Sequence, residues 1–206
     1  FADIEASTFN LDPKKVEALI NKKTKAIMPV SLYGQPADFN EFNALGAKYG
    51  IPVIEDAAQS FGAAYGTSSK RSGALGTIGA TSFFPAKPLG CYGDGGAVFT
   101  DDETLFKKMS VIRVHGQEGR YNHTAIGING RLDTIQCAIL TEKLKRYPWE
   151  MERRHRIAMM YNEAFASLGA HLTVPKVKSD RGSVWAQYTV LVKDRDAFAN
   201  ALKAKG

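Results

Sequence analysis

The residue with the clearest chemical potential is Lys87, which lies between two prolines at the end of a predicted strand. An ordinary lysine, with a pKa near 10.4, is neutral in only about one molecule in 2500 at pH 7. A nucleophilic lysine therefore needs partial burial or a nearby cation. Phe83 and Phe84 precede Lys87 and several glycines follow it, surroundings that fit this need. The pattern favours a nucleophilic amine, and an exposed loop lysine is the alternative.

A second candidate group is Asp56, which follows the apolar run of residues 51–54 and precedes Gln59 by three positions. The run predicts a buried strand of a parallel sheet, and ligands bind outside the carboxyl ends of such strands. A carboxylate there, beside a lysine from a neighbouring strand, is the pair that pyridoxal phosphate chemistry requires, because the acid keeps the pyridine nitrogen protonated. In the alternative interpretation Asp56 caps a following helix and Glu55 is solvated.

Weaker signals come from Ser82, from the glycines at positions 93, 95 and 96, and from His115. The Ser82 hydroxyl and neighbouring amides could cradle a phosphate. The glycines match neither a Walker motif nor the GxGxxG pattern, so we interpret them as tight-turn residues. His115 could be a base or an anion contact, although a lone histidine is more often structural.

The elements that must position these groups alternate between helices and strands, which predicts an α/β fold with helices packed on a mostly parallel sheet. We expect strands at residues 26–32, 51–56, 77–84, 97–100 and 184–192. We expect helices at residues 12–20, 38–49, 103–114, 131–147, 151–168 and 196–204, with Gly50 as a C-cap and Pro148 as a helix end. Residues 62–76 read as a surface loop and residues 175–183 as a linker.

Composition excludes several classes of protein. The 206 residues are 44% hydrophobic and 23% charged, enough for one large domain and part of another. No apolar run approaches the ~18 residues that span a bilayer, so no membrane association is expected. The net charge is +6, but the basic residues are scattered, which argues against nucleic acid and permits anionic small ligands. Cys91 and Cys137 lack metal-ligand spacing, so we expect reduced thiols in the cytoplasm and no metal.

Three segments, at residues 55–60, 82–90 and 127–133, together resemble the DegT/DnrJ/EryC1/StrS family of PLP-dependent nucleotide-sugar aminotransferases. The resemblance implies the fold type I architecture of aspartate aminotransferase. It places a PLP-binding large domain at residues 1–147 and a connecting helix with a partial small α/β domain at residues 148–206. Family members are longer, so we expect parts of both domains to be missing here.

The resemblance also implies roles for single residues. Lys87 would form the internal aldimine with pyridoxal 5'-phosphate and then move protons, and Asp56 would pair with the pyridine nitrogen. Gln59 would contact the cofactor near its phenolic oxygen, and Ser82 would bind its phosphate. Asn129 matches a residue that reaches the phosphate of the partner subunit's cofactor, which implies a homodimer with shared active sites.

Arg131 matches a position near the same shared site, and we add His115 as a second candidate for substrate binding. The presence of Lys87 separates the chain from sugar dehydratases of the same fold, which carry histidine there.

The implied reaction transfers an amino group from L-glutamate to a keto-sugar nucleotide. The segment around Lys87 looks most like enzymes that aminate UDP-2-acetamido-2-deoxy-3-oxo-D-glucuronate in bacterial O-antigen synthesis. Two alternatives remain: a non-catalytic core that binds PLP weakly or not at all, and a PLP enzyme of the same fold that acts on amino acids.

Overall fold

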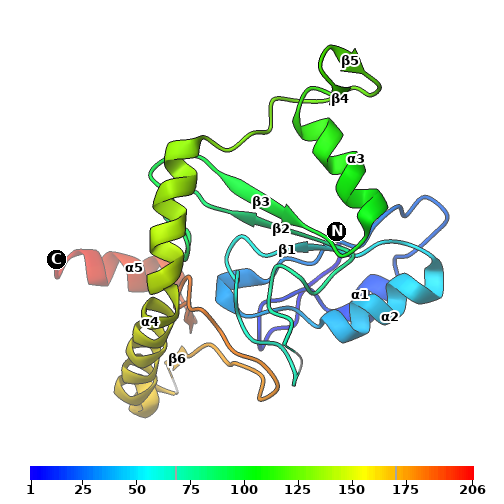
Figure 1. Ribbon diagram of the computed structural model, residues 1–206. Helices are drawn as coiled ribbons and strands as arrows, with labels where there is room; N and C mark the ends of the chain where they lie inside the picture. The colour runs from blue at the N-terminus through cyan, green and yellow to red at the C-terminus, as the bar shows by residue number, and fades with distance from the viewer. Residues whose placement is uncertain (68, 170) are drawn as a thin grey trace.

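The centre of the molecule is a sheet of three strands in the order β1-β2-β3, seen in a computed structural model that describes residues 1–67, 69–169 and 171–206 (Figure 1). Strand β1 (Ile54–Asp56) runs parallel to β2 (Ile78–Ser82), and β2 runs antiparallel to β3 (Gly96–Phe99). The strand predicted at residues 26–32 is reduced to two parallel bridges, Ile27 to Val53 and Val30 to Asp56. These bridges still place residues 27–30 beside β1.

Five helices accompany the sheet in the described residues: α1 (Pro13–Glu17), α2 (Phe39–Tyr49), α3 (Glu103–Arg113), α4 (Thr134–Phe165) and α5 (Arg195–Lys203). Short 3₁₀ turns lie at Leu32–Gly34 and Ala166–Leu168. Helix α1 begins where the Asp12 side chain accepts a hydrogen bond from the Lys14 amide, as predicted, but it ends three residues early. Gly50 caps α2 in the left-handed conformation, as predicted.

Helix α4 passes through Pro148, so the prediction of two helices separated there is wrong. A proline inside a helix costs about 3 kcal/mol. Here Tyr147 and Met151, on either side of the proline, pack against the same apolar cluster, and the Tyr147 hydroxyl donates to the Phe61 carbonyl at 2.7 Å. The burial of Tyr147 and Met151 offsets the free-energy cost of the proline. The division into domains at residues 147 and 148 falls inside this helix and stays a prediction.

Two short hairpins complete the described secondary structure. Strands β4 (Gln117–Gly119) and β5 (Asn122–His123) pair between α3 and α4, and β6 (Leu172–Thr173) pairs with β7 (Leu191–Val192). The strand predicted at residues 184–192 survives only as β7. Its first half is not a strand because the amides of Val184 and Gln187 donate to the carbonyls of Gly34 and Tyr33 instead.

The apolar core has two centres. Phe39 and Phe42 of α2 pack with Val53 beneath the sheet, where both phenylalanine rings are almost fully buried. Leu140 and Tyr147 of α4 form the second cluster with residues of the loop after β2. Because this second cluster includes the segment around Lys87, α4 braces the loop that carries the candidate nucleophile.

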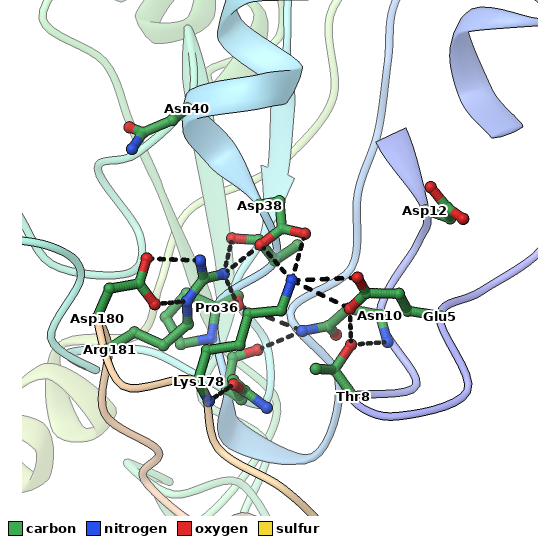
Figure 2. A network of polar contacts seen from close by, with 12 residues as sticks. Glu5, Thr8, Asn10, Asp12, Pro36, Asp38, Asn40, Lys178, Asp180 and Arg181 are labelled. Atoms are coloured by element: carbon green, nitrogen blue, oxygen red, sulfur yellow. Dashed lines mark hydrogen bonds and ion pairs between the residues drawn. The ribbon is translucent and has the colours of Figure 1, made fainter. Parts of the chain in front are cut away.

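Residues 175–183, predicted as a linker, form no helix or strand but are tied firmly to the body of the molecule (Figure 2). The ammonium of Lys178 lies 2.7 Å from a carboxylate oxygen of Asp38 and 3.1 Å from one of Glu5. The Arg181 side chain is only 4% exposed, pairs with Asp38 at 2.8 Å, and lies over the Tyr65 ring. Sequence spacing gives no sign of this network, because its ion-paired partners Asp38 and Glu5 lie 140 and 173 residues before Lys178.

None of the helices built from the described residues is long and apolar enough to cross a membrane.

Candidate active site

The carboxyl ends of β1 and β2 bring two of the predicted residues to one edge of the sheet. The strands are parallel, and Asp56 pairs in register with Ala80, so Ser82 lies two residues further along the neighbouring strand. The chain turns after β2, where the Lys87 amide donates to the Phe84 carbonyl at 2.9 Å. Lys87 is partly buried and follows Ser82 by five residues. A carboxylate, a hydroxyl and an amine thus come from adjacent strand ends.

Asp56 is fixed at this edge by its backbone and by its side chain. Its amide donates to the Pro29 carbonyl, and its carbonyl accepts from the Ser31 amide. One carboxylate oxygen accepts from the Ala58 amide at 2.9 Å, within a turn rather than at the start of a helix. The interpretation of Asp56 as a helix cap is therefore wrong. The half-buried carboxylate is free to face a cationic ligand group as well.

Glu55, the neighbouring acid, points to the other side of the sheet and is fully buried. Its carboxylate accepts from the Ser72 hydroxyl at 2.6 Å and from the Leu75 amide at 2.9 Å. Burial raises the pKa of Glu55, and the hydrogen bonds from Ser72 and Leu75 oppose that rise only in part. The expectation of a solvated Glu55 is wrong, and this residue ties β1 to the loop of residues 62–76.

The Lys87 loop is closed by close packing. A Cβ atom on Gly90 would lie 2.7 Å from the carbonyl oxygens of Phe84 and Pro85, so only glycine fits there. Cys91 is fully buried, and its sulfur lies 3.0 Å from the Phe83 carbonyl and 3.1 Å from the Gly93 carbonyl.

The sequence predicts turn residues at Gly95 and Gly96, but the structure explains these two glycines differently. A Cβ atom on Gly95 would meet Leu132, and one on Gly96 would lie 2.7 Å from the Thr81 carbonyl oxygen. Neither residue has a positive φ. The close approach of the Thr81 backbone, rather than a turn conformation, requires glycine at position 96, and a Cβ atom at position 95 would displace the Leu132 side chain.

Ser82 and Gln59 are already engaged within the protein. The Ser82 hydroxyl oxygen accepts from the Phe84 amide at 3.2 Å, which leaves its hydrogen free to donate. The Gln59 side-chain oxygen accepts from the Tyr33 amide at 2.6 Å. Ser82 can therefore serve an anionic group, and Gln59 can offer the N–H groups of its amide.

The three remaining candidates, His115, Asn129 and Arg131, lie in the segment between α3 and α4 and are exposed. Strands β4 and β5, within this segment, project away from the sheet (Figure 1). The His115 amide donates to the Ile128 carbonyl, and the Arg131 guanidinium donates to the Asn129 side chain at 3.1 Å. Leu132, the residue after Arg131, packs against the apolar cluster that contains Phe83 and Cys91, so the end of this segment lies against the loop that carries Lys87.

Sequence reasoning missed Tyr33, which holds Gln59. Tyr33 has φ 59° and ψ 0°, a left-handed conformation that is uncommon for a residue other than glycine. The following glycine, Gly34, was a usable turn signal. No local signal could have paired Tyr33 with Gln59, 26 residues later.

Comparisons with known proteins identify the family of the chain. The family model described as the DegT/DnrJ/EryC1/StrS aminotransferase family matches residues 1–206. The chain is 51% identical to UDP-2-acetamido-2-deoxy-3-oxo-D-glucuronate aminotransferase of Pseudomonas aeruginosa, with 100% of this chain and 56% of that protein aligned. It is 39% identical to the UDP-N-acetyl-3-dehydro-alpha-D-glucosamine 3-aminotransferase of Acidithiobacillus ferrooxidans, covering 100% of this chain and 55% of that one.

Solved structures give the same result. A DegT DnrJ EryC1 StrS aminotransferase from Brucella abortus superposes with a TM-score of 0.92 at 42% identity, covering 100% of this chain and 56% of that one. The DesV structure from S. venezuelae, in complex with a ketimine intermediate, superposes with a TM-score of 0.93 at 37% identity, covering 99% and 54%. The chain thus spans about half the length of its relatives.

The prediction of an α/β fold of the fold type I aminotransferase kind is confirmed by these superpositions. On the match of the family model along its whole length, the chain belongs to the DegT/DnrJ/EryC1/StrS aminotransferase family.

Proposed function

We propose that this chain carries the catalytic core of a pyridoxal 5'-phosphate-dependent aminotransferase that moves an amino group from L-glutamate to a keto-sugar nucleotide. The observation that carries the proposal is the placement of Asp56 and Ser82 at the ends of adjacent parallel strands, with Lys87 in the loop that follows Ser82. A carboxylate for the pyridine nitrogen, a hydroxyl for the phosphate and an amine for the aldehyde form the donor set that this cofactor needs. Bound there, the cofactor supplies an electron sink.

Each residue has a defined task in this proposal. Asp56 would hold a proton on the pyridine nitrogen, because a neighbouring carboxylate favours the charged form of that nitrogen. Lys87 would hold the cofactor through its Nζ and would then accept and return a proton at the same atom. Ser82 donates its hydroxyl hydrogen to the phosphate. Gln59 donates its amide hydrogens to the phenolic oxygen.

The overall exchange is balanced. L-glutamate gives up its amino group and leaves as 2-oxoglutarate, and the ketone of the sugar nucleotide becomes an amine. The P. aeruginosa relative is named for UDP-2-acetamido-2-deoxy-3-oxo-D-glucuronate, and this supports the same sugar as the first substrate to test. The net charge of +6 is compatible with the two anionic substrates.

We also propose a homodimer in which each subunit completes the site of the other. The exposure of Asn129 and Arg131 supports this arrangement, because a partner subunit could reach both side chains. His115 stays a candidate for substrate contact on the same segment. We place the enzyme in the cytoplasm, in the synthesis of bacterial surface polysaccharide.

The first experiment is to incubate the chain with pyridoxal 5'-phosphate, reduce with borohydride, and map the modified peptide by mass spectrometry. We expect the label on Lys87 and its loss in Lys87→Ala. Lys193→Ala, a substitution at a lysine far along the chain, is the matched control and should keep the label.

Label on Lys87 leads to an assay with L-glutamate and UDP- or dTDP-linked ketosugars. A folded protein without label on Lys87 would reject the enzyme proposal for this chain and favour a non-catalytic core. Turnover of glutamate without any dependence on a sugar nucleotide would favour an enzyme that acts on amino acids.

A further inference from the structure

The orientation of the Gln59 side chain is determined by the protein itself. The backbone N–H of Tyr33 is a donor, so the Gln59 atom at 2.6 Å from it must be the amide oxygen. The Gln59 NH₂ group therefore faces away from Tyr33. Gln59 is partly buried and follows Asp56 by three residues at the carboxyl edge of the sheet. Its amide oxygen is engaged by Tyr33, and its NH₂ group remains as the donor end of the side chain.

The Tyr33–Gly34 turn, which supplies this contact, is a strained piece of backbone. Tyr33 has φ 59° and Gly34 has φ 119°. A residue other than glycine in the left-handed region is held there only when the surrounding structure compensates. The contact to Gln59 thus depends on whatever holds the turn.

Residues 176–187, which we call the clamp segment, hold the turn from the far end of the chain. The Val184 amide donates to the Gly34 carbonyl at 3.0 Å, and the Gln187 amide donates to the Tyr33 carbonyl at 3.3 Å. The fit is tight, because a Cβ atom on Gly34 would lie 2.6 Å from the Trp185 nitrogen. Both carbonyls of the turn are therefore satisfied by the clamp segment.

The clamp segment is itself anchored beside the turn. The Gln35 side chain accepts from the Lys178 amide at 2.8 Å and donates to the Lys176 carbonyl at 2.9 Å. Arg181 donates to the carbonyls of Pro36 and Ala37 at 3.0 and 2.9 Å (Figure 2). Every residue from position 33 to 37 is thus touched by the clamp segment through its backbone or its side chain.

Charge strengthens this anchor. Burial by itself lowers the pKa of Lys178, but hydrogen bonds with Asp38 and Glu5 outweigh it and raise the pKa above its ordinary value. Lys178 stays protonated throughout the physiological range and keeps both ion pairs.

We propose that the clamp segment is a positioning device for the active site: it holds the Tyr33–Gly34 turn, and the turn fixes Gln59 as a hydrogen-bond donor toward the oxygen of a ligand beside Asp56. The inference rests on the proposed function in so far as the ligand is pyridoxal 5'-phosphate. Tyr33 and Gln35 are positioning residues, and Gln59 alone would touch the cofactor.

The test loosens the clamp segment without touching the site. Gln35→Ala removes two hydrogen bonds between the loop and the clamp segment. Asn43→Ala is the matched control, since it removes a single side-chain hydrogen bond to a distant backbone group, the Leu75 carbonyl, away from the turn. Urea unfolding establishes that both variants fold, so that their effects on the site are compared at known stability.

The first readout needs no cofactor. Hydrogen exchange at the Tyr33 amide, followed by NMR, reports its bond to Gln59. We expect exchange to accelerate at least fivefold in Gln35→Ala and in Gln59→Leu, and to stay unchanged in Asn43→Ala. Unchanged exchange in Gln35→Ala would overturn the proposal, because the turn would then be held without the clamp segment.

The second readout is the affinity for pyridoxal 5'-phosphate, measured by fluorescence quenching in a double-mutant cycle. We expect Gln35→Ala to weaken binding about fivefold, the equivalent of one typical hydrogen bond, and to have no further effect in the Gln59→Leu background. Equal weakening in both backgrounds would show that the clamp segment does not act through Gln59. Absence of any binding by the unchanged chain would reject the proposed function, while the exchange data would still decide whether the clamp segment holds the turn.

Discussion

At the carboxyl edge of the sheet, Asp56 and Gln59 are partly buried and are held by residues 29–33, whereas His115, Asn129 and Arg131 are exposed and hydrogen-bond within the segment between α3 and α4. Strands β4 and β5 of that segment project away from the sheet (Figure 1). The difference teaches that the groups at the sheet edge are held in place by this chain, whereas the exposed groups between α3 and α4 are left accessible. In the proposed function, the first set would bind the cofactor and the second would be shared with a partner subunit.

The largest expected effect comes from removing the buried anchor of the first region. Arg181→Ala deletes an almost fully buried guanidinium, removes one of the two cations paired with Asp38, and leaves the Pro36 and Ala37 carbonyls without this donor. We expect a loss of about 3 to 5 kcal/mol in the free energy of unfolding, measured with urea. Arg195→Ala, at an exposed arginine paired with Asp196, is the control and should change it by less than about 0.5 kcal/mol. If both substitutions lowered the free energy of unfolding equally, the buried arginine would contribute no more to stability than the exposed one, and the comparison would fail.

A smaller effect, dependent on pH, is expected at Glu55. Its raised pKa means that the folded state holds the proton more tightly than the unfolded chain, so this contribution to stability is complete below the ordinary pKa of 4.5 and is lost as pH rises through the folded value. Glu55→Gln cannot lose a proton. Its stability relative to the unchanged chain should therefore increase between pH 4 and pH 8, by about 1.4 kcal/mol for each unit of the pKa displacement.

Urea unfolding at a series of pH values measures this difference, with Glu142→Gln as the exposed control. Parallel pH profiles for Glu55→Gln and the unchanged chain would show that the buried carboxyl does not titrate differently in the folded state.

The smallest effect is expected in the second region. Asn129→Ala removes an exposed hydrogen bond to Arg131 and should change the free energy of unfolding by less than about 0.5 kcal/mol. A loss above 1 kcal/mol would mean that this segment is coupled to the body of the molecule and would weaken the comparison.

Elements with strong local signals were predictable. The apolar spacing of α2, its Gly50 cap and the Asp12 cap of α1 all depend on residues within a few positions of one another. The position of Asp56 and Ser82 was also predictable, because the carboxyl ends of parallel strands lie at the same edge of the sheet.

The failures share a cause, which is contact between residues distant in sequence. Pro148 stays helical because Tyr147 and Met151 both pack on residues of the Lys87 loop region and its neighbours. The strand predicted after residue 184 does not form in its first half, because its amides donate to the Tyr33–Gly34 turn instead of to a neighbouring strand. Helix and strand periodicity carries no information about such partners, so neither outcome follows from local patterns.

The packing around Cys91 means that the two thiols of the chain should differ in their reactivity toward added reagents. Cys91 is fully buried in the loop that carries Lys87, whereas Cys137 lies exposed near the start of α4. A maleimide should therefore label Cys137 at once in the folded protein and reach Cys91 only when that loop opens. In a chain with Cys137 replaced by serine, the rate of Cys91 labelling measures how often the Lys87 loop opens. A ligand bound to Lys87 should lower this labelling rate.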